Sequence, residues 1–527
     1  MDNMERLMYL ASCFYFLYVP IKQSMHMFQQ NRYRMDRYRV WLVEEINVKR
    51  NYLLKLFLCL ATCYGLLFVP HDHLPDILMI MLIFIYAYIL HKMEEETEYR
   101  KPLVMTGRIR RLMVCFYLLY ALFLGLLAVY GTSHIRILLT PLLYFSPWIA
   151  IFLCGSLMMP IEHKIRMHYV KDAKRILRQH QELSIIGITG SYGKTSVKNI
   201  LHTLLKDSYY TLMTPHSYNN QMGITLTVRT QLQRLHDVFL CEMGADHVGE
   251  IKALMKFVQP QFGVVTAVGP QHLQTFGSLE NILHEKMQMI EQLPLHGIGF
   301  LNRDNAYIRS YKVHNHCDLI WFGIQEPCDY QAVDLRYTPE GSEFKILHKG
   351  KKYPFHTRLL GEHNVLNIVC AVAVARSFDV SWILLQQEVA SLPYVEHRLE
   401  VRRNNAYTIL DNAYNSNPTG ASYSLDVLQQ MPNHRFIVTP GFLDLGDLQD
   451  QEQYRFGKKI VDCCDTVILV GKKQTAAIQK GLEETEFPMD QVYVVSSIQE
   501  AFALLSRLAS PEDTVLLEND LPDAFNH

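Results

Sequence analysis

Long apolar runs are concentrated in the first 160 residues of this 527-residue chain. Several are about as long as the ~20 residues that a helix needs to cross a bilayer. The sequence therefore predicts a membrane domain over residues 1–160 with about five transmembrane helices, at 7–20, 52–70, 77–90, 112–130 and 137–159. Leu74 and Pro75 can extend the short run at 77–90, and for this run and 7–20 a buried or re-entrant helix stays an alternative. The run at 7–20 has no small-residue cleavage site, so we do not interpret it as a removable signal peptide.

Basic residues mark the side of the membrane on which the rest of the chain lies. The connecting segments 21–50 and 91–111 are rich in Lys and Arg, whereas 71–76 contains neither. Positively charged loops stay in the cytoplasm. The stretch 161–182 is basic again and is predicted to be one amphipathic linker helix, which places everything after it in the cytoplasm. These basic clusters can also contact anionic membrane lipid, although topology alone explains them.

The charge balance and the cysteines exclude two other kinds of protein. The chain has 51 basic and 52 acidic residues, so no overall field favours a nucleic acid partner. Its eleven cysteines show no CxxC spacing and indicate neither a zinc site nor a disulfide framework.

The stretch "LSIIGITGSYGKTSVKN" (183–199) has the character of a phosphate-binding loop. A short apolar strand runs into glycines, and a pattern with helical period follows. Backbone N–H groups of such a loop face an anion at the start of a helix. Lys194 supplies a positive charge to the phosphates, and the Thr195 hydroxyl can bind Mg²⁺. Ile188 stands where the strict GxxxxGK[ST] pattern has its first glycine, so a purely structural glycine turn is the alternative.

The form TGSxGKTS resembles the Mur ligase superfamily, which uses ATP to make amide bonds in cell-wall precursors, and the MurF branch above all. Further stretches resemble motifs of that family in the same order: "YNNQMGITLT" (218–227), "CEMGADHVGEI" (241–251), the histidine- and lysine-bearing stretch 263–286, "LLGEHNVLNIVCAVAVA" (359–375) and "LDNAYNSNP" (410–418). The resemblance covers roughly 183–527. It implies two α/β domains after the membrane domain: a central ATP-binding domain with a parallel sheet over 183–395, and a Rossmann-like C-terminal domain over 396–527. Within the central domain, polar residues alternate along 329–360, which predicts a pair of β-hairpins.

The resemblance also implies an activity and two metal ions. ATP phosphorylates an acceptor carboxylate, and the amine of an amino acid or short peptide attacks the acyl phosphate. The implied phosphate-binding residues are Gly190, Ser191, Gly193, Lys194, Thr195 and Ser196. Thr195 and Glu242 would hold one Mg²⁺, and His272 with a carbamylated Lys286 a second. The alternatives are an ordinary loop histidine at 272 and an exposed helical lysine at 286.

The remaining site residues are implied in the same way. Asn364 and Asn367 would border the adenine, with helix capping by Asn364 as the alternative. Arg398 would reach the phosphates and act in catalysis with Lys194, His272 and Lys286. Asp411 would meet the ribose. Asn219 and Asn220 lie in the substrate loop.

The sequence departs from the family where the substrates are chosen. Asn412 replaces a usual acidic residue and Thr225 a usual proline.

Only 23 residues, 161–183, separate the last apolar run from the phosphate loop, too few for the uridine-nucleotide-binding domain of MurF-like enzymes. We therefore expect a membrane-bound acceptor, such as a lipid-linked wall precursor, unless the anchor merely localises a soluble reaction. A non-catalytic ATP-binding scaffold, a transporter, and an iterative folate or polyglutamate ligase are the other hypotheses.

Overall fold

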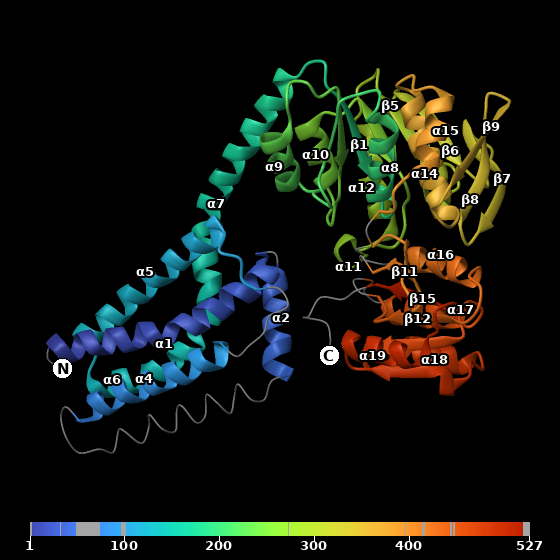
Figure 1. Cartoon of the computed structure of the whole chain (residues 1–527). Coiled ribbons are helices and arrows are strands. Elements are labelled where there is room, and N and C mark those ends of the chain that lie inside the picture. The colour runs from blue at the N-terminus through green and yellow to red at the C-terminus, as the bar shows by residue number, and fades with distance from the viewer. Residues whose placement is uncertain are drawn as a thin grey trace. The chain divides into compact units, whose positions relative to one another are not determined.

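The computed structural model describes residues 3–31, 33–48, 74–95, 102–271, 273–395, 397–413, 417–442, 445 and 448–519 (Figure 1). The chain forms two compact units, Met1–His168 and Tyr169–His527. The first is helical and the second contains two β-sheets. This agrees with the predicted fold class, a helical domain followed by two α/β domains. The predicted boundary between the central and C-terminal domains stays a prediction.

The first unit contains a set of helices around an apolar core. They are α1 (Asn3–Gln30), α2 (Met35–Val48), α4 (Leu74–Glu95), α5 (Gly107–Tyr130), α6 (Ser133–Leu139), the short 3-10 helix η1 (Thr140–Tyr144) and the first part of α7 (Ser146–Gln179). Three stretches among the described residues are long and apolar enough to cross a membrane: Asp76–Glu95, Gly107–Tyr130 and Ser146–Gln179. The predicted helices at 77–90 and 112–130 are confirmed as helices of this kind. The run at 7–20 lies in α1, which is not one of the three, and the run at 52–70 lies outside the described residues.

Two sequence predictions about α7 are wrong. The apolar run at 137–159 is not one helix, because η1 with a proline in its first turn interrupts it and α7 starts only at Ser146. Proline has no amide hydrogen, so it begins a helix more readily than it continues one. The linker at 161–182 is also not a separate helix, since α7 runs on without a break to Gln179.

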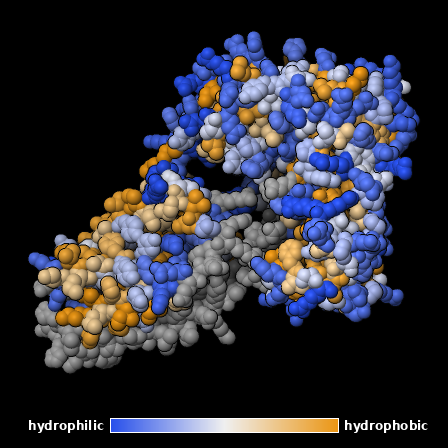
Figure 2. All heavy atoms as spheres, viewed as in Figure 1, coloured by the Kyte–Doolittle hydropathy of each residue, from blue (hydrophilic) through white to orange (hydrophobic). Residues whose placement is uncertain are grey.

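Apolar side chains cover much of the outside of the first unit. Figure 2 shows them at its surface, and those on α4 and α5 include Phe84, Tyr88, Leu118 and Leu122, each more than half exposed. Soluble proteins rarely expose contiguous apolar surface of this kind. Inside the unit, the Arg136 guanidinium pairs with the fully buried Asp76 carboxylate at 2.8 Å and ties α6 to the start of α4. The unit thus encloses this ion pair and exposes apolar side chains, a pattern typical of helices that can cross a membrane.

The second unit begins with a nine-stranded sheet of order β2-β3-β1-β4-β5-β6-β7-β8-β9. Pairing is parallel from β2 to β7 and antiparallel among the last three strands, so the hairpin pair predicted at 329–360 is confirmed. The strands are β1 (Ser184–Thr189), β2 (Thr211–Met213), β3 (Val238–Glu242), β4 (Phe262–Val265), β5 (Ile298–Asn302), β6 (Asp318–Gly323), β7 (Tyr330–Thr338), β8 (Gly341–His348) and β9 (Lys351–Thr357).

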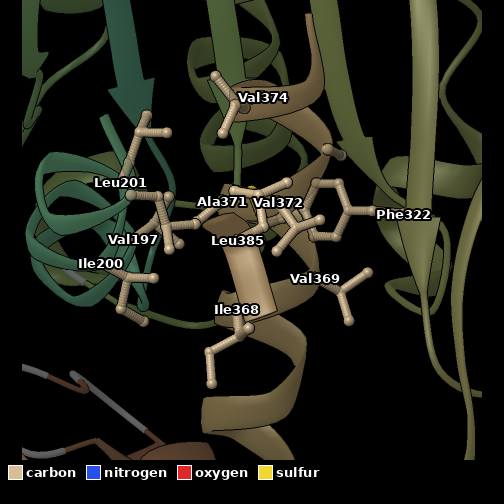
Figure 3. Packing of buried hydrophobic residues seen from close by; sticks show 14 of the residues in the cluster. Val197, Ile200, Leu201, Phe322, Ile368, Val369, Ala371, Val372, Val374 and Leu385 are labelled. Atoms are coloured by element: carbon tan, nitrogen blue, oxygen red, sulfur yellow. The ribbon is translucent and has the colours of Figure 1, made fainter. Parts of the chain in front are cut away.

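Helices cover both faces of this sheet. One apolar cluster packs α8 (Lys194–Leu205), α14 (Glu362–Arg376) and α15 (Trp382–Ala390) on one face. Figure 3 shows Val197 and Leu201 of α8 meeting Ile368, Ala371 and Val372 of α14 in this cluster. A second cluster packs α10 (Glu250–Val258), α12 (Leu279–Glu291) and the end of α7 on the other face. The smaller helices of this part are α9 (Gln221–Gln231), α11 (Leu273–Phe276) and α13 (Ala306–Ser310).

The last part of the chain forms a six-stranded sheet of order β10-β11-β15-β12-β13-β14, parallel except for the pairing of β10 with β11. Its strands are β10 (Glu400–Arg403), β11 (Thr408–Asn412), β12 (Arg435–Thr439), β13 (Thr466–Val470), β14 (Val492–Val495) and β15 (Thr514–Glu518). Its helices are α16 (Pro418–Gln429), α17 (Gln449–Ile460), α18 (Ala476–Glu484), the 3-10 helix η3 (Met489–Gln491) and α19 (Ile498–Leu508). Polar residues at the carboxyl ends of both sheets form the candidate site.

Candidate functional site

The phosphate loop lies where β1 passes into α8. Strand β1 ends at Thr189 and α8 begins at Lys194. Gly190 and Gly193 have φ angles of 146° and 82°, and a Cβ on Gly190 would lie 2.1 Å from Thr266 Oγ1. Only glycine fits this close approach and this backbone geometry. The loop therefore opens the first turn of α8 to an anion.

Lys194 is folded back onto the loop that carries it. Its Nζ donates to the carbonyl oxygens of Gly190 at 2.6 Å and Ser191 at 3.1 Å. Burial lowers the Lys194 pKa to about 8; Glu242 opposes this shift and the positive charge of Arg398 adds to it. The charge of Arg398 therefore acts on Lys194, while a contact of Arg398 with the phosphates stays a prediction. Among the described residues, the hydrogen bonds of this ammonium go to carbonyl oxygens, so it is suited to receive an anion.

Glu242 is the last residue of β3 and is 1% exposed. Its Oε2 accepts hydrogen bonds from Thr195 Oγ1 at 3.1 Å and from Lys198 Nζ at 3.0 Å. Its Oε1 accepts from Asn219 Nδ2 at 3.1 Å. The predicted pair Thr195 and Glu242 therefore lies together beside the loop. Lys198 was not predicted as a site residue, although a lysine three residues after Thr195 shares its face of the helix.

The two substrate-loop asparagines have different surroundings. Asn219 contacts the Glu242 carboxylate, as described. Asn220 is exposed and caps α9, its side-chain oxygen accepting from the Gly223 N–H at 2.9 Å. A role of either in substrate binding stays a prediction.

Lys286 lies on α12 and is 3% exposed, so the alternative of an exposed helical lysine is wrong. Its Nζ donates to the Ala245 carbonyl at 3.2 Å and lies 5.7 Å from the centre of the Phe276 ring. Burial, and then the charge of Lys194, lowers the Lys286 pKa to about 7. Two poorly solvated lysines therefore influence each other at one edge of the sheet. His272, the predicted partner of Lys286, lies outside the described residues.

The neighbouring Glu285, which was not predicted, fixes the loop after β3. It is 2% exposed, and its carboxylate accepts from the backbone N–H groups of Gly249 at 2.7 Å and Ile251 at 2.5 Å. It thereby holds the start of α10 against α12. In the sequence, Glu285 and Lys286 are two adjacent charged residues of α12, a pattern typical of an exposed helix face, so the sequence did not indicate that both are buried.

The paired asparagines of α14 point to different partners. Asn364 Nδ2 donates to the Leu360 carbonyl at 2.9 Å, and the helix N-cap is Gly361, so the capping alternative for Asn364 is wrong. A Cβ on Gly193 would lie 2.8 Å from Asn367 Oδ1. Asn367 therefore adjoins the phosphate loop, and both asparagines are buried.

Asp411, in the last part of the chain, lies beside the side chains of His397 and Arg402. It is buried and accepts from His397 Nδ1 at 2.9 Å and lies 3.3 Å from an Arg402 nitrogen. The neighbouring Asn412 donates to the buried Glu518 of β15, which sequence reasoning did not single out. A ribose contact by Asp411 stays a prediction.

The described residues contain no group of three or more His, Cys, Asp and Glu side chains placed to hold a metal ion. Thr195 and Glu242 lie together at the loop, and a hydroxyl with a carboxylate is a donor set typical of Mg²⁺ bound together with phosphates.

A phosphate loop at the carboxyl end of a parallel strand, with two lysines and a glutamate gathered beside it, defines a nucleotide-dependent enzyme of the phosphate-loop class. Comparison with known families is more specific. Residues 188–375 match the Mur ligase middle domain and residues 397–518 match the Mur ligase glutamate ligase domain. The chain belongs to the Mur ligase family and is an ATP-dependent acid–amino acid ligase.

Its similarity to individual enzymes is distant. The UDP-N-acetylmuramoyl-tripeptide–D-alanyl-D-alanine ligase of Bacillus subtilis is 28% identical over 344 residues, which cover 64% of this chain and 74% of that enzyme. The structure of MurF from Acinetobacter baumannii superposes with a TM-score of 0.61 at 24% identity, over 68% of this chain and 78% of that one. MurF of Thermotoga maritima in complex with ADP gives a TM-score of 0.61 at 24% identity, over 67% and 80%. The two structures show a shared fold.

Proposed function

We propose that this protein is a membrane-anchored ligase that joins an amino acid or short peptide to the carboxylate of a lipid-linked cell-wall precursor, at the cytoplasmic face of the membrane. The observation that carries this proposal is the continuity of α7. Its first part is a candidate membrane span, and Val170, Ala173 and Leu177 near its end are buried in the core beside the large sheet. Only residues 180–183 separate α7 from β1, so no further domain lies between span and phosphate loop.

The residues at the loop support an acyl-phosphate reaction. An oxygen of the acceptor carboxylate attacks the γ-phosphorus of ATP, and ADP leaves. The amine then attacks the acyl carbon, phosphate leaves, and the nitrogen gives up a proton as the amide forms. Both steps involve negatively charged phosphate and carboxylate groups, and Lys194 and Arg398 would neutralise that charge; the electrostatic effect of Arg398 on the Lys194 pKa supports this. Asn364 and Asn367 would border the adenine, and Asp411 would bind the ribose.

Among the described residues, Thr195 and Glu242 support one Mg²⁺ ion, and a second ion would depend on Lys286 together with His272, which lies outside them. Glu242 accepts three hydrogen bonds, which leaves one of about four acceptor positions of a carboxylate for a cation or its water. The described residues place only a carbonyl, that of Ala245, within hydrogen-bonding distance of Lys286 Nζ. Burial lowers the pKa of Lys286, which favours the neutral amine that carbon dioxide can carbamylate. Thr195 and Glu242 would hold one ion, and His272 with carbamylated Lys286 the other; the ions would neutralise phosphate charge.

Proximity supports a membrane-attached acceptor. An enzyme and an acceptor confined to one surface meet at a higher effective concentration than two solutes do. The name of the Bacillus subtilis relative includes D-alanyl-D-alanine, and the matched C-terminal domain is described as a glutamate ligase domain. D-alanyl-D-alanine and glutamate are therefore the first amines to test.

Mass spectrometry of cell-wall precursors after deletion of the gene tests the proposal. We expect a lipid-linked precursor that lacks one amide-linked residue to accumulate, while the soluble uridine-nucleotide precursors keep their composition. A change confined to the soluble precursors would contradict a membrane-bound acceptor. A strain that carries the Lys194→Ala variant is the matched control, because the anchor stays in place and only catalysis is removed.

A further inference from the structure

Lys198 is a buried charged group near the phosphate loop. It lies on α8 between the core residues Val197 and Ile200, and its exposed fraction is 1%. Its ammonium donates to Glu242 Oε2 at 3.0 Å and to the carbonyl oxygen of His216. A buried lysine is rare unless it is paired, and here the partner is the carboxylate beside the loop. Lys198 is too enclosed to touch a nucleotide itself.

The two carboxylate oxygens of Glu242 accept different numbers of hydrogen bonds. Oε2 accepts from both Thr195 and Lys198, at 3.1 and 3.0 Å. Oε1 accepts from Asn219 alone, at 3.1 Å, among the described residues. A carboxylate oxygen offers about two acceptor positions, so Oε2 is saturated and Oε1 keeps one position open.

The hydrogen bond to Glu242 also orients the hydroxyl group of Thr195. Its hydroxyl hydrogen is directed at Glu242 Oε2, so the lone pairs of the hydroxyl oxygen point elsewhere. A hydroxyl oxygen with its hydrogen already engaged is suited to bind a hard cation. Lys198 keeps Oε2 in place for this contact, since its ammonium is itself fixed by the His216 carbonyl.

We propose that Lys198 is a positioning residue for the cation that accompanies ATP: it fixes Oε2 of Glu242, so that Oε1 and the Thr195 hydroxyl oxygen are the atoms presented to Mg²⁺. This inference rests on the proposed function, because it takes Glu242 and Thr195 as the cation ligands. It goes further in assigning a role to a side chain that contacts neither ATP nor acceptor. Outer-shell partners of this kind commonly change metal affinity 10- to 100-fold when they are removed.

The experiment titrates Mg²⁺ against binding of a fluorescent ADP analogue to the purified full-length chain, without turnover. Lys198→Met should raise the Mg²⁺ concentration for half-maximal binding about tenfold, while binding of the analogue in EDTA stays within about twofold of wild type. Lys206→Met, at the exposed lysine directly after the same helix, should leave both values unchanged. Lys198→Gln is measured beside Lys198→Met, because it keeps a hydrogen-bond donor and is the milder change if Lys198→Met folds poorly. For Lys198→Gln we expect a smaller rise in the same direction.

The outcomes separate this inference from the proposed function. If Glu242→Gln leaves the Mg²⁺ dependence intact, the assignment of the metal ligands fails. If Glu242→Gln abolishes it while the Lys198 variants match wild type, the positioning role alone is overturned. A lower Mg²⁺ requirement in the Lys198 variants also overturns it, since Lys198 would then only compete with the cation for the carboxylate. The double variant Lys198→Met with Glu242→Gln should unfold at a higher temperature than Lys198→Met alone, because no buried charge is left unpaired.

Discussion

The Asn412 amide donates to both carboxylate oxygens of Glu518, at 3.2 and 3.0 Å, across the paired strands β11 and β15. Glu518 is fully buried and also accepts from the Ser424 hydroxyl. Asn412 stands where relatives are expected to carry an acidic residue. In this chain an acid there would face a buried carboxylate, so the asparagine and Glu518 form one hydrogen-bonded pair.

This pair yields a stability prediction. Asn412→Asp should destabilise the last domain by about 2–4 kcal/mol, because it replaces a donor by a like charge beside a buried carboxylate. Chemical denaturation followed by fluorescence measures the loss. Gln451→Glu, which adds the same charge on the exposed surface of α17, should change the free energy of unfolding by less than about 0.5 kcal/mol. Equal effects of the two variants would show that the Asn412–Glu518 contact is unimportant.

The phosphate loop yields a prediction about turnover. Lys194→Ala and Glu242→Gln should each lower Mg²⁺-dependent ATP turnover at least about 100-fold, because each removes charge neutralisation or a metal ligand at the phosphates. Glutamine is chosen at 242 since it keeps the shape of the side chain against Lys198. Circular dichroism and thermal unfolding check that both variants fold. Unchanged turnover in either one would refute the active-site assignment.

Lys286 yields a prediction about covalent modification. Carbon-13 NMR of the protein in labelled bicarbonate should show one carbamate signal that disappears in Lys286→Ala, and this variant should lose most activity. Added bicarbonate should not restore it. Lys252→Ala, an exposed lysine on α10, should keep both signal and activity. A fully active preparation without a carbamate signal would contradict the idea.

His363 yields a prediction about acid stability. Its Nδ1 is buried without a hydrogen-bond partner among the described residues, and burial lowers the His363 pKa to about 4. The unfolded chain therefore binds a proton here at a pH where the folded chain does not. Stability from this group is complete above the ordinary histidine pKa of about 6.5 and falls as the pH drops toward 4.

Thermal unfolding between pH 7.5 and pH 5 measures this effect, with both limits set at about one unit or more from the ordinary histidine pKa. His363→Gln should flatten the loss of stability toward acid pH, whereas the exposed His284→Gln should follow the wild-type curve. If His363→Gln and wild type lose stability in parallel, His363 is not the group responsible.

The sequence predicts the fold of the second unit well, because strand, glycine loop and helix follow one another within a few residues around Lys194. The hairpins at 329–360 were equally predictable, since alternation with period two is a local property. The start of α7 could not be predicted in this way. The mean hydropathy over 137–159 is high, and it does not show that a proline begins a separate 3-10 helix within this run. Burial of Lys198, Glu285 and Glu518 depends on partners far away in the chain, which no local pattern reveals.

The most direct test of the account compares two acceptors in one reconstituted assay. The full-length protein in lipid nanodiscs receives ATP, Mg²⁺ and a panel of amines, together with either a lipid-linked wall precursor or its soluble uridine-nucleotide counterpart. Amide product is measured by mass spectrometry, with Lys194→Ala as the inactive control. The account predicts faster product formation from the lipid-linked precursor. Faster formation from the soluble nucleotide precursor would contradict it.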